Sequence, residues 1–376
     1  MLTAVGWRLA FLGLLPWLAV PRSGSDQPEA AAGVVSSAYA AAVERYVAGD
    51  RDGAVAAFAA LSERELREQV AALRTLGRRA RACGVCADTV AWRKAPLAAA
   101  LMLHTDSSIA QRPHGATVPL HESLAAELAQ AMADDPERRG FARRWYTAMA
   151  ELAQGESRWD EALRWADRGL DAFPGSAELL HVEGSIEEGL SGELASGWTG
   201  DVFDPSTRQT QLNLVRGRES RQRLERARSA LRDAVAADPS LDPARLRLGL
   251  VAWRLGDARA ARAAFETVLS QTRSRDTAFL AYLFRGRLDE DAGHFEDAAR
   301  GYEAALSLDP GSQSARLALS HARLRLGDRA GARREVEAAL ALAPRGAQLD
   351  AFWIYPWGPA VGVEERLQAL RLEASS

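Results

Sequence analysis

The sequence predicts an all-α protein built from stacked antiparallel helix pairs. Three observations predict it: a spacing of 34 residues between matching positions, glycines where helices would reverse, and prolines where helices would end. Hydrophobic residues make up 47% and charged residues 26% of the chain, as in soluble globular proteins. The formal net charge of −3 provides no strong field for nucleic acid, so we expect no nucleic-acid partner.

The N-terminal segment, residues 1–25, predicts a secretory signal peptide. Arg8 precedes an apolar run at 9–20, which is shorter than the roughly twenty residues that cross a bilayer. A charged start, a short apolar core and a small, polar continuation are typical of such signals. We therefore expect export to the periplasm or the exterior. If the signal stays uncleaved, residues 9–20 form a membrane anchor and the chain's one membrane contact. Residues 26–33 indicate a flexible lead.

The clearest repeat lies within residues 241–346. The spacing of 34 joins five pairs of positions: Gly293 and Gly327, Ala298 and Ala332, Tyr302 and Val336, Ala305 and Ala339, and Pro310 and Pro344. Glycine adopts the left-handed conformation that reverses the chain after a helix. Alanine lets two helices approach closely, and proline ends a helix because it lacks an N–H donor. Each unit is then a helix pair that buries its apolar stripes only by stacking on its neighbours.

These units resemble the tetratricopeptide repeat (TPR). The unit from Asp242 carries the family's residues at Leu248, Gly249, Gly256, Ala261 and Phe265. The next unit carries them at Tyr282, Gly286, Gly293, Phe295, Ala298, Tyr302, Ala305 and Pro310. Arg329 replaces an aromatic residue and Asp289 replaces a tyrosine, which indicates diverged units. The resemblance implies a right-handed superhelix of about six to seven antiparallel helix pairs with a C-terminal capping segment.

Weaker copies of the unit precede this region. Residues 34–142 predict diverged TPR-like helices with a loop insertion at 105–120, and residues 143–240 predict further units with an insertion at 191–222. The expected helices that flank these insertions cover 90–104, 121–134, 177–190 and 224–237, and another helix is expected at 63–81.

Residues 347–376 depart from the repeat. A densely aromatic stretch at 350–358 precedes a short amphipathic helix at 363–372, with Leu367 and Leu370 on one face. The last unit of an array has an open apolar end. We expect this segment to cover that end; the alternative is an exposed aromatic patch that binds a partner.

Cys83 and Cys86 are the most suggestive chemical motif. A covalent haem site would need histidine at position 87, where Ala87 stands, and a thioredoxin-like site would need neighbouring strands. In an exported protein we expect a disulfide or two reduced thiols. A zinc site would need two further ligands, for which His104, His114 and His121 are near in sequence. We expect no metal and no cofactor.

The remaining motifs favour no enzyme. The sequence contains no dinucleotide fingerprint, phosphate-binding loop, zinc-protease helix or nucleophile elbow, so we assign no catalytic residue. A basic stretch at 216–232 is interleaved with Glu219 and Glu225, which favours ion pairing within helices. The alternative there is an acidic polymer or a lipid headgroup.

The resemblance also implies a binding surface. In TPR proteins the first helix of each pair lines a concave groove, which here would include Leu246, Leu250, Trp253, Arg254, Leu283, Arg287, Glu290, Leu317, His321 and Arg325. Apolar anchors among arginines suit a protein or peptide segment. We therefore predict an exported, non-catalytic scaffold that binds a protein partner. The alternatives are a spacer in an envelope assembly and a metal- or redox-dependent protein that uses Cys83 and Cys86.

Overall fold

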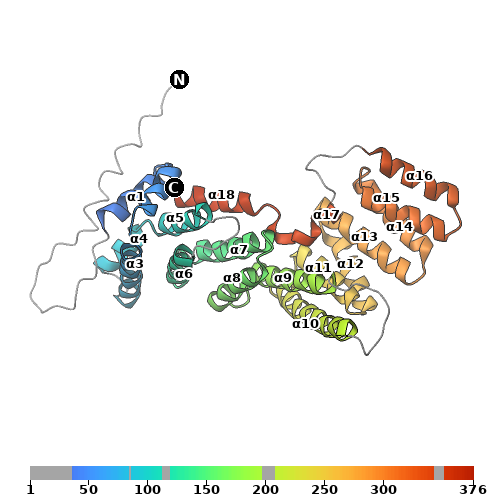
Figure 1. Ribbon diagram of the computed structural model, residues 1–376, viewed down its shortest axis with the longest axis horizontal. Coiled ribbons are helices and arrows are strands. Elements are labelled where there is room, and N and C mark those ends of the chain that lie inside the picture. The colour runs from blue at the N-terminus through green and yellow to red at the C-terminus, as the bar shows by residue number, and fades with distance from the viewer. Residues whose placement is uncertain (1–35, 84–85, 112–118, 197–207, 343–350) are drawn as a thin grey trace, which may run out of the picture. The chain divides into compact units, whose positions relative to one another are not determined.

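The computed structural model describes residues 36–83, 86–111, 119–196, 208–342 and 351–376 (Figure 1). Within these ranges the chain forms helices and no strand. It divides into unit 1, Met1–Trp145 with Glu364–Ser376, and unit 2, Tyr146–Val363. The expected signal peptide, the flexible lead and His114 lie outside the described residues. In the part that is described, no helix is both long enough and apolar enough to cross a membrane.

Unit 2 is an array of consecutive helix pairs. It begins within α7 (Arg139–Gly155), and its pairs are α7 with α8 (Trp159–Ala172), α9 (Ala177–Ser196) with α10 (Arg208–Ala237), α11 (Asp242–Arg254) with α12 (Ala258–Gln271), α13 (Arg275–Asp291) with α14 (Phe295–Leu308), and α15 (Gln313–Arg325) with α16 (Arg329–Ala341). From α9 onward the two helices of each pair contact each other, and the second contacts the first helix of the next pair. The predicted all-α fold of stacked helix pairs is confirmed.

The turns within these pairs follow from short local sequences. Gly256 and Gly327 have φ of 89° and 86°, a conformation that other residues resist. An aspartate follows each glycine and caps the second helix: Asp257 accepts a hydrogen bond from the Ala260 N–H at 3.0 Å, and Asp328 accepts one from the Gly331 N–H at 2.7 Å. Gly-Asp therefore ends one helix and starts the next.

Glycine also sets the distance between helices in a pair. A Cβ at Gly286 of α13 would lie 2.7 Å from the ring of Tyr302 on α14. The missing side chain lets Tyr302 fit between the helices, where it is fully buried. Tyr302 belongs to an apolar cluster that runs through α11, α12, α13, α14 and α15. The core is therefore continuous from pair to pair.

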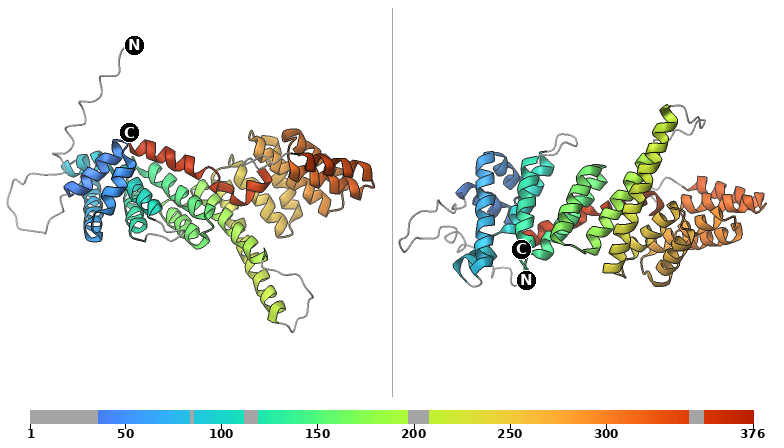
Figure 2. Two further views of the ribbon diagram at one scale, coloured as in Figure 1. Left: turned by 45° about the horizontal axis from the view of Figure 1, so that its top comes forward. Right: turned by 90° about the horizontal axis from the view of Figure 1, so that it is seen from below.

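The insertion predicted at 191–222 is wrong in its bounds. Helix α9 continues to Ser196, and α10 begins at Arg208 and extends over 30 residues. Figure 2 shows α10 running well past the helix that follows it. Charged residues hold the two helices together, as Arg223 on α10 pairs with the buried Glu187 on α9 at 2.9 Å. Of the predicted insertion, residues 191–196 and 208–222 are thus helical, and residues 197–207 lie outside the described residues.

Unit 1 contains shorter helices. They are α1 (Ser37–Val47), α2 (Arg51–Ala59), α3 (Glu63–Cys83), α4 (Ala87–Lys94), α5 (Leu97–Ala110), α6 (Pro119–Ala133), the first part of α7, and α18 (Val363–Ala374). The helix expected at 90–104 is broken at Pro96, because proline removes a hydrogen bond of the ladder. The loop predicted at 105–120 is also wrong in its bounds: residues 105–110 belong to α5, and α6 begins at Pro119.

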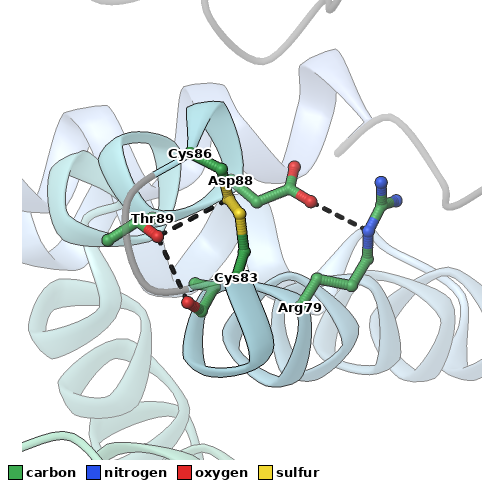
Figure 3. The surroundings of a disulfide bond; sticks show 6 residues. Arg79, Cys83, Cys86, Asp88 and Thr89 are labelled. Carbon is green, nitrogen blue, oxygen red and sulfur yellow. Dashed lines mark hydrogen bonds and ion pairs between the residues drawn. A yellow bond between two sulfur atoms is a disulfide. The ribbon is translucent and has the colours of Figure 1, made fainter.

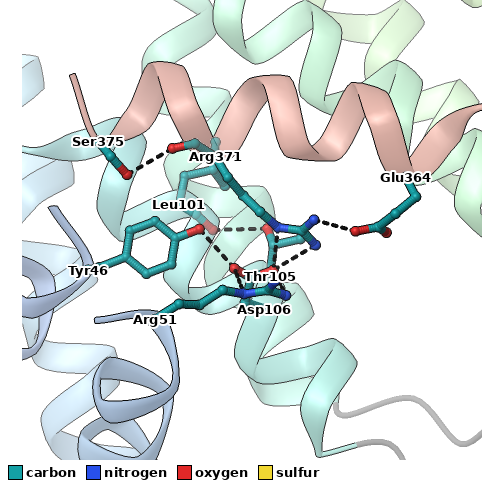
Figure 4. Close-up of polar contacts among 8 residues, drawn as sticks. All are labelled: Tyr46, Arg51, Leu101, Thr105, Asp106, Glu364, Arg371 and Ser375. Atoms are coloured by element: carbon teal, nitrogen blue, oxygen red, sulfur yellow. Dashed lines mark hydrogen bonds and ion pairs between the residues drawn. The ribbon is translucent and has the colours of Figure 1, made fainter. Parts of the chain in front are cut away.

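The C-terminal helix packs in unit 1. The apolar face predicted for it is buried, since Leu367 and Leu370 are 0% and 3% exposed. Next to them Arg371 reaches Asp106 of α5, with Nη2 3.0 Å from Oδ1 (Figure 4). Tyr46 donates to the same carboxylate at 2.8 Å, and Arg51 pairs with it at 2.8 Å. Asp106 is thus shared by helices from both ends of the chain.

The segment 347–376 was expected to cap the last repeat, and its described contacts correct that expectation. Residues 364–376 belong to unit 1. Residues Ala351–Ile354 (α17) and the 3₁₀ helix Tyr355–Ala360 (η2) contact α13 and α9 of unit 2. The buried charges of Asp106 in unit 1 and of Glu188 in unit 2 give this segment stronger polar partners than an open apolar end could.

Candidate protein-binding surface

The candidate site is formed by the first helices of four pairs, α9, α11, α13 and α15, and is called here the first-helix surface. The ten residues predicted to bind a partner lie on the last three of these helices. Three predicted apolar anchors, Leu246, Leu250 and Leu283, are only 3%, 9% and 5% exposed. Their apolar cluster is also packed against Ala351 and Tyr355 of the chain's own C-terminal segment. These leucines are therefore core residues and not the exposed anchors that were predicted.

Aromatic side chains hold the C-terminal segment on this surface. The ring of Tyr355 meets the ring of Phe284 on α13 edge-on, with centroids 5.2 Å apart, and Phe352 meets Phe284 in the same way at 6.5 Å. The Arg247 guanidinium of α11 lies 4.3 Å from the centroid of the Tyr355 ring. Two helices of the array thus contribute one side chain each to a tyrosine-binding contact.

A buried ion pair completes that contact. Arg247 and Glu188 of α9 form a salt bridge with side chains 4% and 5% exposed. Arg247 also donates to the Tyr355 carbonyl oxygen at 3.1 Å, and the Tyr355 hydroxyl lies 3.2 Å from Glu188 Oε2. Burial raises the pKa of Tyr355 well above its usual range, so the hydroxyl stays protonated and donates to the carboxylate. The predicted binding residue Arg254 also pairs with Glu188, at 3.6 Å.

Two other predicted residues meet between α11 and α13. The Trp253 indole N–H donates to Asp291 Oδ2 at 3.0 Å, and Arg287 lies 3.8 Å from Asp291 Oδ1. Trp253 is half-buried and Arg287 is exposed. The structure therefore brings this pair together around a carboxylate that the sequence did not single out.

Helix α15, the first helix of the last pair, has its three predicted binding residues at the surface. Leu317 is 49% exposed, and His321 and Arg325 are exposed too. The His321 ring contacts Glu290 through Nδ1, and Glu290 is buried and also accepts from the Tyr302 hydroxyl at 2.6 Å. Arg325 lies over the ring of Phe295, 4.4 Å from its centroid. An apolar side chain and two basic groups are thus accessible at one end of the surface.

The residues that sequence reasoning missed are Glu188, Arg247 and Tyr355. A weak signal existed for each. Glu188 is the second of two adjacent glutamates in α9, Arg247 stands between the buried Leu246 and Leu250, and Tyr355 lies in the stretch noted as densely aromatic. Their convergence joins positions up to 167 residues apart, which no local pattern reveals.

The second candidate, the cysteine motif, lies in unit 1. Cys83 ends α3, Cys86 precedes α4, and a disulfide joins them with Cα atoms 5.9 Å apart (Figure 3). Thr89 Oγ1 lies 3.6 Å from Cys86 Sγ and donates to the Ala80 carbonyl, while Arg79 pairs with Asp88 at 2.9 Å. The disulfide therefore ties the end of one helix to the start of the next.

The nearby histidines form a separate buried group. His104 Nδ1 lies 3.1 Å from His121 Nδ1, and His104 Nε2 lies 3.3 Å from the Tyr39 hydroxyl. Burial lowers the pKa of both histidines, and His121 also lowers that of His104, so both rings are neutral. Across the described residues, no group of three or more histidine, cysteine or carboxylate side chains is placed to hold a metal ion.

The basic stretch at 216–232 is engaged within the fold where it is described. Arg223 pairs with Glu187 at 2.9 Å, and Arg228 pairs with Glu225 at 2.5 Å. The pair of Arg228 with Glu225 is the pairing within a helix that the interleaved charges favoured, whereas Arg223 pairs across to α9.

Comparison with known proteins identifies the repeat. Tetratricopeptide-repeat family models match residues 243–274 and 291–352. No curated protein matches the chain.

Several solved structures are similar at low identity. MamA from Desulfovibrio magneticus RS-1 is 16% identical with a TM-score of 0.38, over 53% of this chain and 94% of MamA. PilF from Pseudomonas aeruginosa is 12% identical with a TM-score of 0.43, over 62% and 91% of the two chains. YrrB, described as a TPR protein with an unusual peptide-binding site, is 15% identical with a TM-score of 0.37, over 63% and 99%. The matched residues include helices α11, α12, α14, α15 and α16 of the stacked array, so the chain contains tetratricopeptide repeats, which are typical of scaffolds for protein–protein interaction.

Proposed function

We propose that this protein is an exported scaffold that binds a segment of a partner protein along its first-helix surface, at the end formed by α13 and α15. The observation that carries the proposal is the contrast along that surface. At α9, α11 and α13 it already holds a polypeptide segment, the chain's own residues 351–360. On α15 and the neighbouring face of α13, Leu317, His321, Arg325 and Arg287 are exposed.

The chemistry of this exposed end suits an acidic, partly apolar segment. Leu317 offers an apolar contact that loses water on binding. Arg325 and Arg287 bear guanidinium groups that pair with carboxylates in a fixed geometry. Binding energy in such interfaces comes from a few buried anchors, so Leu317 is expected to matter more than the rim charges.

Site-specific photo-crosslinking in the native host tests the site. The crosslinking residue p-benzoylphenylalanine replaces Leu317, and in a matched control it replaces Arg333, whose side chain is 81% exposed on α16. We expect a discrete crosslinked species from position 317 and none from position 333. The same products from both positions, or none from position 317, would contradict binding at this end and favour a spacer that uses no such surface.

Export is supported by two observations. The segment at 1–25 has the pattern of a signal peptide. Cys83 and Cys86 form a disulfide, a bond that persists mainly in oxidising compartments. Intact-mass analysis of protein from the host's envelope and culture fluid should give a chain shortened at its N-terminus, with both cysteines protected from alkylation until a reductant is added. Recovery of the full-length chain with free thiols from the cytosol would contradict export.

A further inference from the structure

The segment Ala351–Ala360 contacts the first-helix surface as a bound peptide would. It consists of two short helical turns, the four-residue helix α17 and the six-residue 3₁₀ helix η2, with no longer helix of its own. Tyr355 and Phe352 both contact the array through their rings, and Phe352 remains 38% exposed. Anchoring by one or two aromatic side chains is typical of peptides bound to a surface.

The surface under Tyr355 specifies what a ligand must supply. Glu188 and Arg247 are both buried, and a buried charge is costly unless each of its hydrogen-bonding groups has a partner. Tyr355 supplies a hydroxyl donor to Glu188, a carbonyl acceptor to Arg247 and a ring for the guanidinium to cover. Phenylalanine would supply the ring and the carbonyl but not the hydroxyl. The site therefore selects tyrosine.

The backbone after this tyrosine is specified as well. Gly358 has φ of 42°, and a Cβ at this position would clash with the Arg247 guanidinium and lie 3.1 Å from Ser185 Oγ of α9. The chain thus passes close to the same buried arginine three residues after Tyr355. A ligand with tyrosine and, three residues later, glycine meets both requirements.

We propose that α9, α11 and α13 form a docking site for a tyrosine-containing segment of a partner protein, and that residues 351–360 are its built-in competitor. The inference rests on the proposed function, that this scaffold binds protein segments, and adds a second, internally occupied site to it. Because the resident segment is covalently linked, its effective concentration is in the millimolar range, and a free ligand must overcome that advantage. Weakening the resident segment therefore opens the site.

A peptide-binding experiment with the full-length protein tests this. The probe is a fluorescent peptide with the chain's own sequence 350–361, and its anisotropy is measured with wild-type protein and with Tyr355→Ala. We expect at least tenfold tighter binding to the variant, and at least tenfold loss when the tyrosine of the peptide is replaced by alanine. The combination of Tyr355→Ala with Glu188→Gln should also lose the peptide, which locates binding at this site.

Two controls exclude misfolding and self-association as the cause of altered peptide binding: the conservative variant Tyr355→Phe and the molecular mass of each protein in solution. Tyr355→Phe retains the ring and removes one hydroxyl, so it should fold and bind the probe between wild type and Tyr355→Ala. Equal binding to all three proteins, or no binding to variants whose helical signal is unchanged, overturns the proposal. Wild-type dimers that Tyr355→Ala dissociates, observed by light scattering, would also overturn it, because the occupant would then be a second copy. Crosslinking from position 317 tests the proposed function separately, since that position lies on α15.

Discussion

At the scale of single residues, the repeat depends on positions where a side chain cannot be tolerated. Gly286 and Tyr302 are the clearest pair, because any Cβ at Gly286 would overlap the buried ring. Such positions are also the ones that the sequence predicts best, since the small residue and the aromatic residue recur together in the repeat.

Substitution of Gly286 measures this close approach. Gly286→Ala should destabilise unit 2 by about 1–3 kcal/mol, because the ring or the helix must move to admit one methyl group. The matched control is Gly192→Ala on α9, where a Cβ would meet nothing within 4 Å. There alanine should stabilise by up to about 1 kcal/mol through helix propensity. Urea unfolding measures both, and equal effects at the two glycines would show that packing at Gly286 is unimportant.

Glu183 on α9 is a residue whose charge opposes folding. Burial, and then the charges of Asp167, Glu187 and Asp233, raise the pKa of Glu183 to about 7. Its folded pKa lies above its unfolded value of 4.5, so the folded state holds the proton more tightly. The resulting penalty is absent below the unfolded pKa, grows as the pH rises from there to the folded pKa, and is fully present above it. Stability at neutral pH is therefore reduced by this carboxylate.

The variant Glu183→Gln removes that penalty. It should stabilise unit 2 by about 1 kcal/mol at pH 8, a value reduced from the full shift because the side chain is partly exposed. At pH 4.5 the gain should be close to zero. Urea midpoints at the two pH values test the difference, with Glu225→Gln on the neighbouring helix as the matched carboxylate-to-amide control. A gain at pH 4.5 as large as at pH 8 would rule out the titration of Glu183 as its cause.

At the scale of helices, the sequence predicts an element well where its limits are set by neighbouring residues. Gly256-Asp257 and Gly327-Asp328 place turns that the structure retains, because glycine and the capping carboxylate act within a few residues. The bounds of α9 and α10 were missed, because polar residues of the two helices pair across them, as where the Ser220 hydroxyl donates to the Ser191 carbonyl at 3.0 Å, and such contacts require the folded chain.

The surface against which the last helix, α18, packs could not be predicted from the sequence either. Leu367 and Leu370 mark its buried face, but a sequence pattern does not say which surface covers that face. The deciding partner of α18 is Asp106, 265 residues from Arg371. The same holds for the candidate site: the exposed residues of α15 followed from repeat positions, whereas the contact of Tyr355 with Glu188 and Arg247 required the folded chain.

Helix α18 should depend on that long-range ion pair. Arg371→Met should destabilise unit 1 by about 3 kcal/mol, because it leaves the buried Asp106 with fewer partners. Tyr46 and Arg51 still contact the carboxylate, so the loss should stay below that of an isolated buried charge. The control on the same helix is Glu373→Gln, whose partner Arg144 is 52% exposed and whose loss should cost less than about 1 kcal/mol.

A double-mutant cycle separates the pair from the packing of the methylene groups. With Asp106→Asn already present, Arg371→Met should cost clearly less than it does alone. Denaturant unfolding of the four proteins measures this coupling. The same cost in both backgrounds would mean that Arg371 stabilises unit 1 through its apolar stem and not through Asp106.

At the scale of the whole molecule, the two units contain different titrating groups and should respond differently to acid. Unit 1 buries the neutral pair His104 and His121, whose pKa values are lowered by burial. A buried histidine whose pKa is depressed lowers the free energy of unfolding of its unit as the pH falls below the unfolded pKa of 6.5. Unit 2 contains His181, whose pKa is lowered to about 3, but also Glu183, whose pKa is raised to about 7. Acid therefore weakens unit 2 through one group and strengthens it through the other.

We accordingly expect unit 1 to lose about 1 kcal/mol per buried histidine between pH 7.5 and 5.5, while unit 2 changes little because His181 and Glu183 offset each other. Pulse-labelling hydrogen exchange after equilibration in urea, with the pulse at one fixed pH, gives the midpoint for peptides from each unit. Replacing His104 and His121 by asparagine should remove the response of unit 1, and His181→Asn should make unit 2 more stable in acid. A parallel loss in both units that these variants leave unchanged would mean that groups other than these histidines and Glu183 govern acid unfolding.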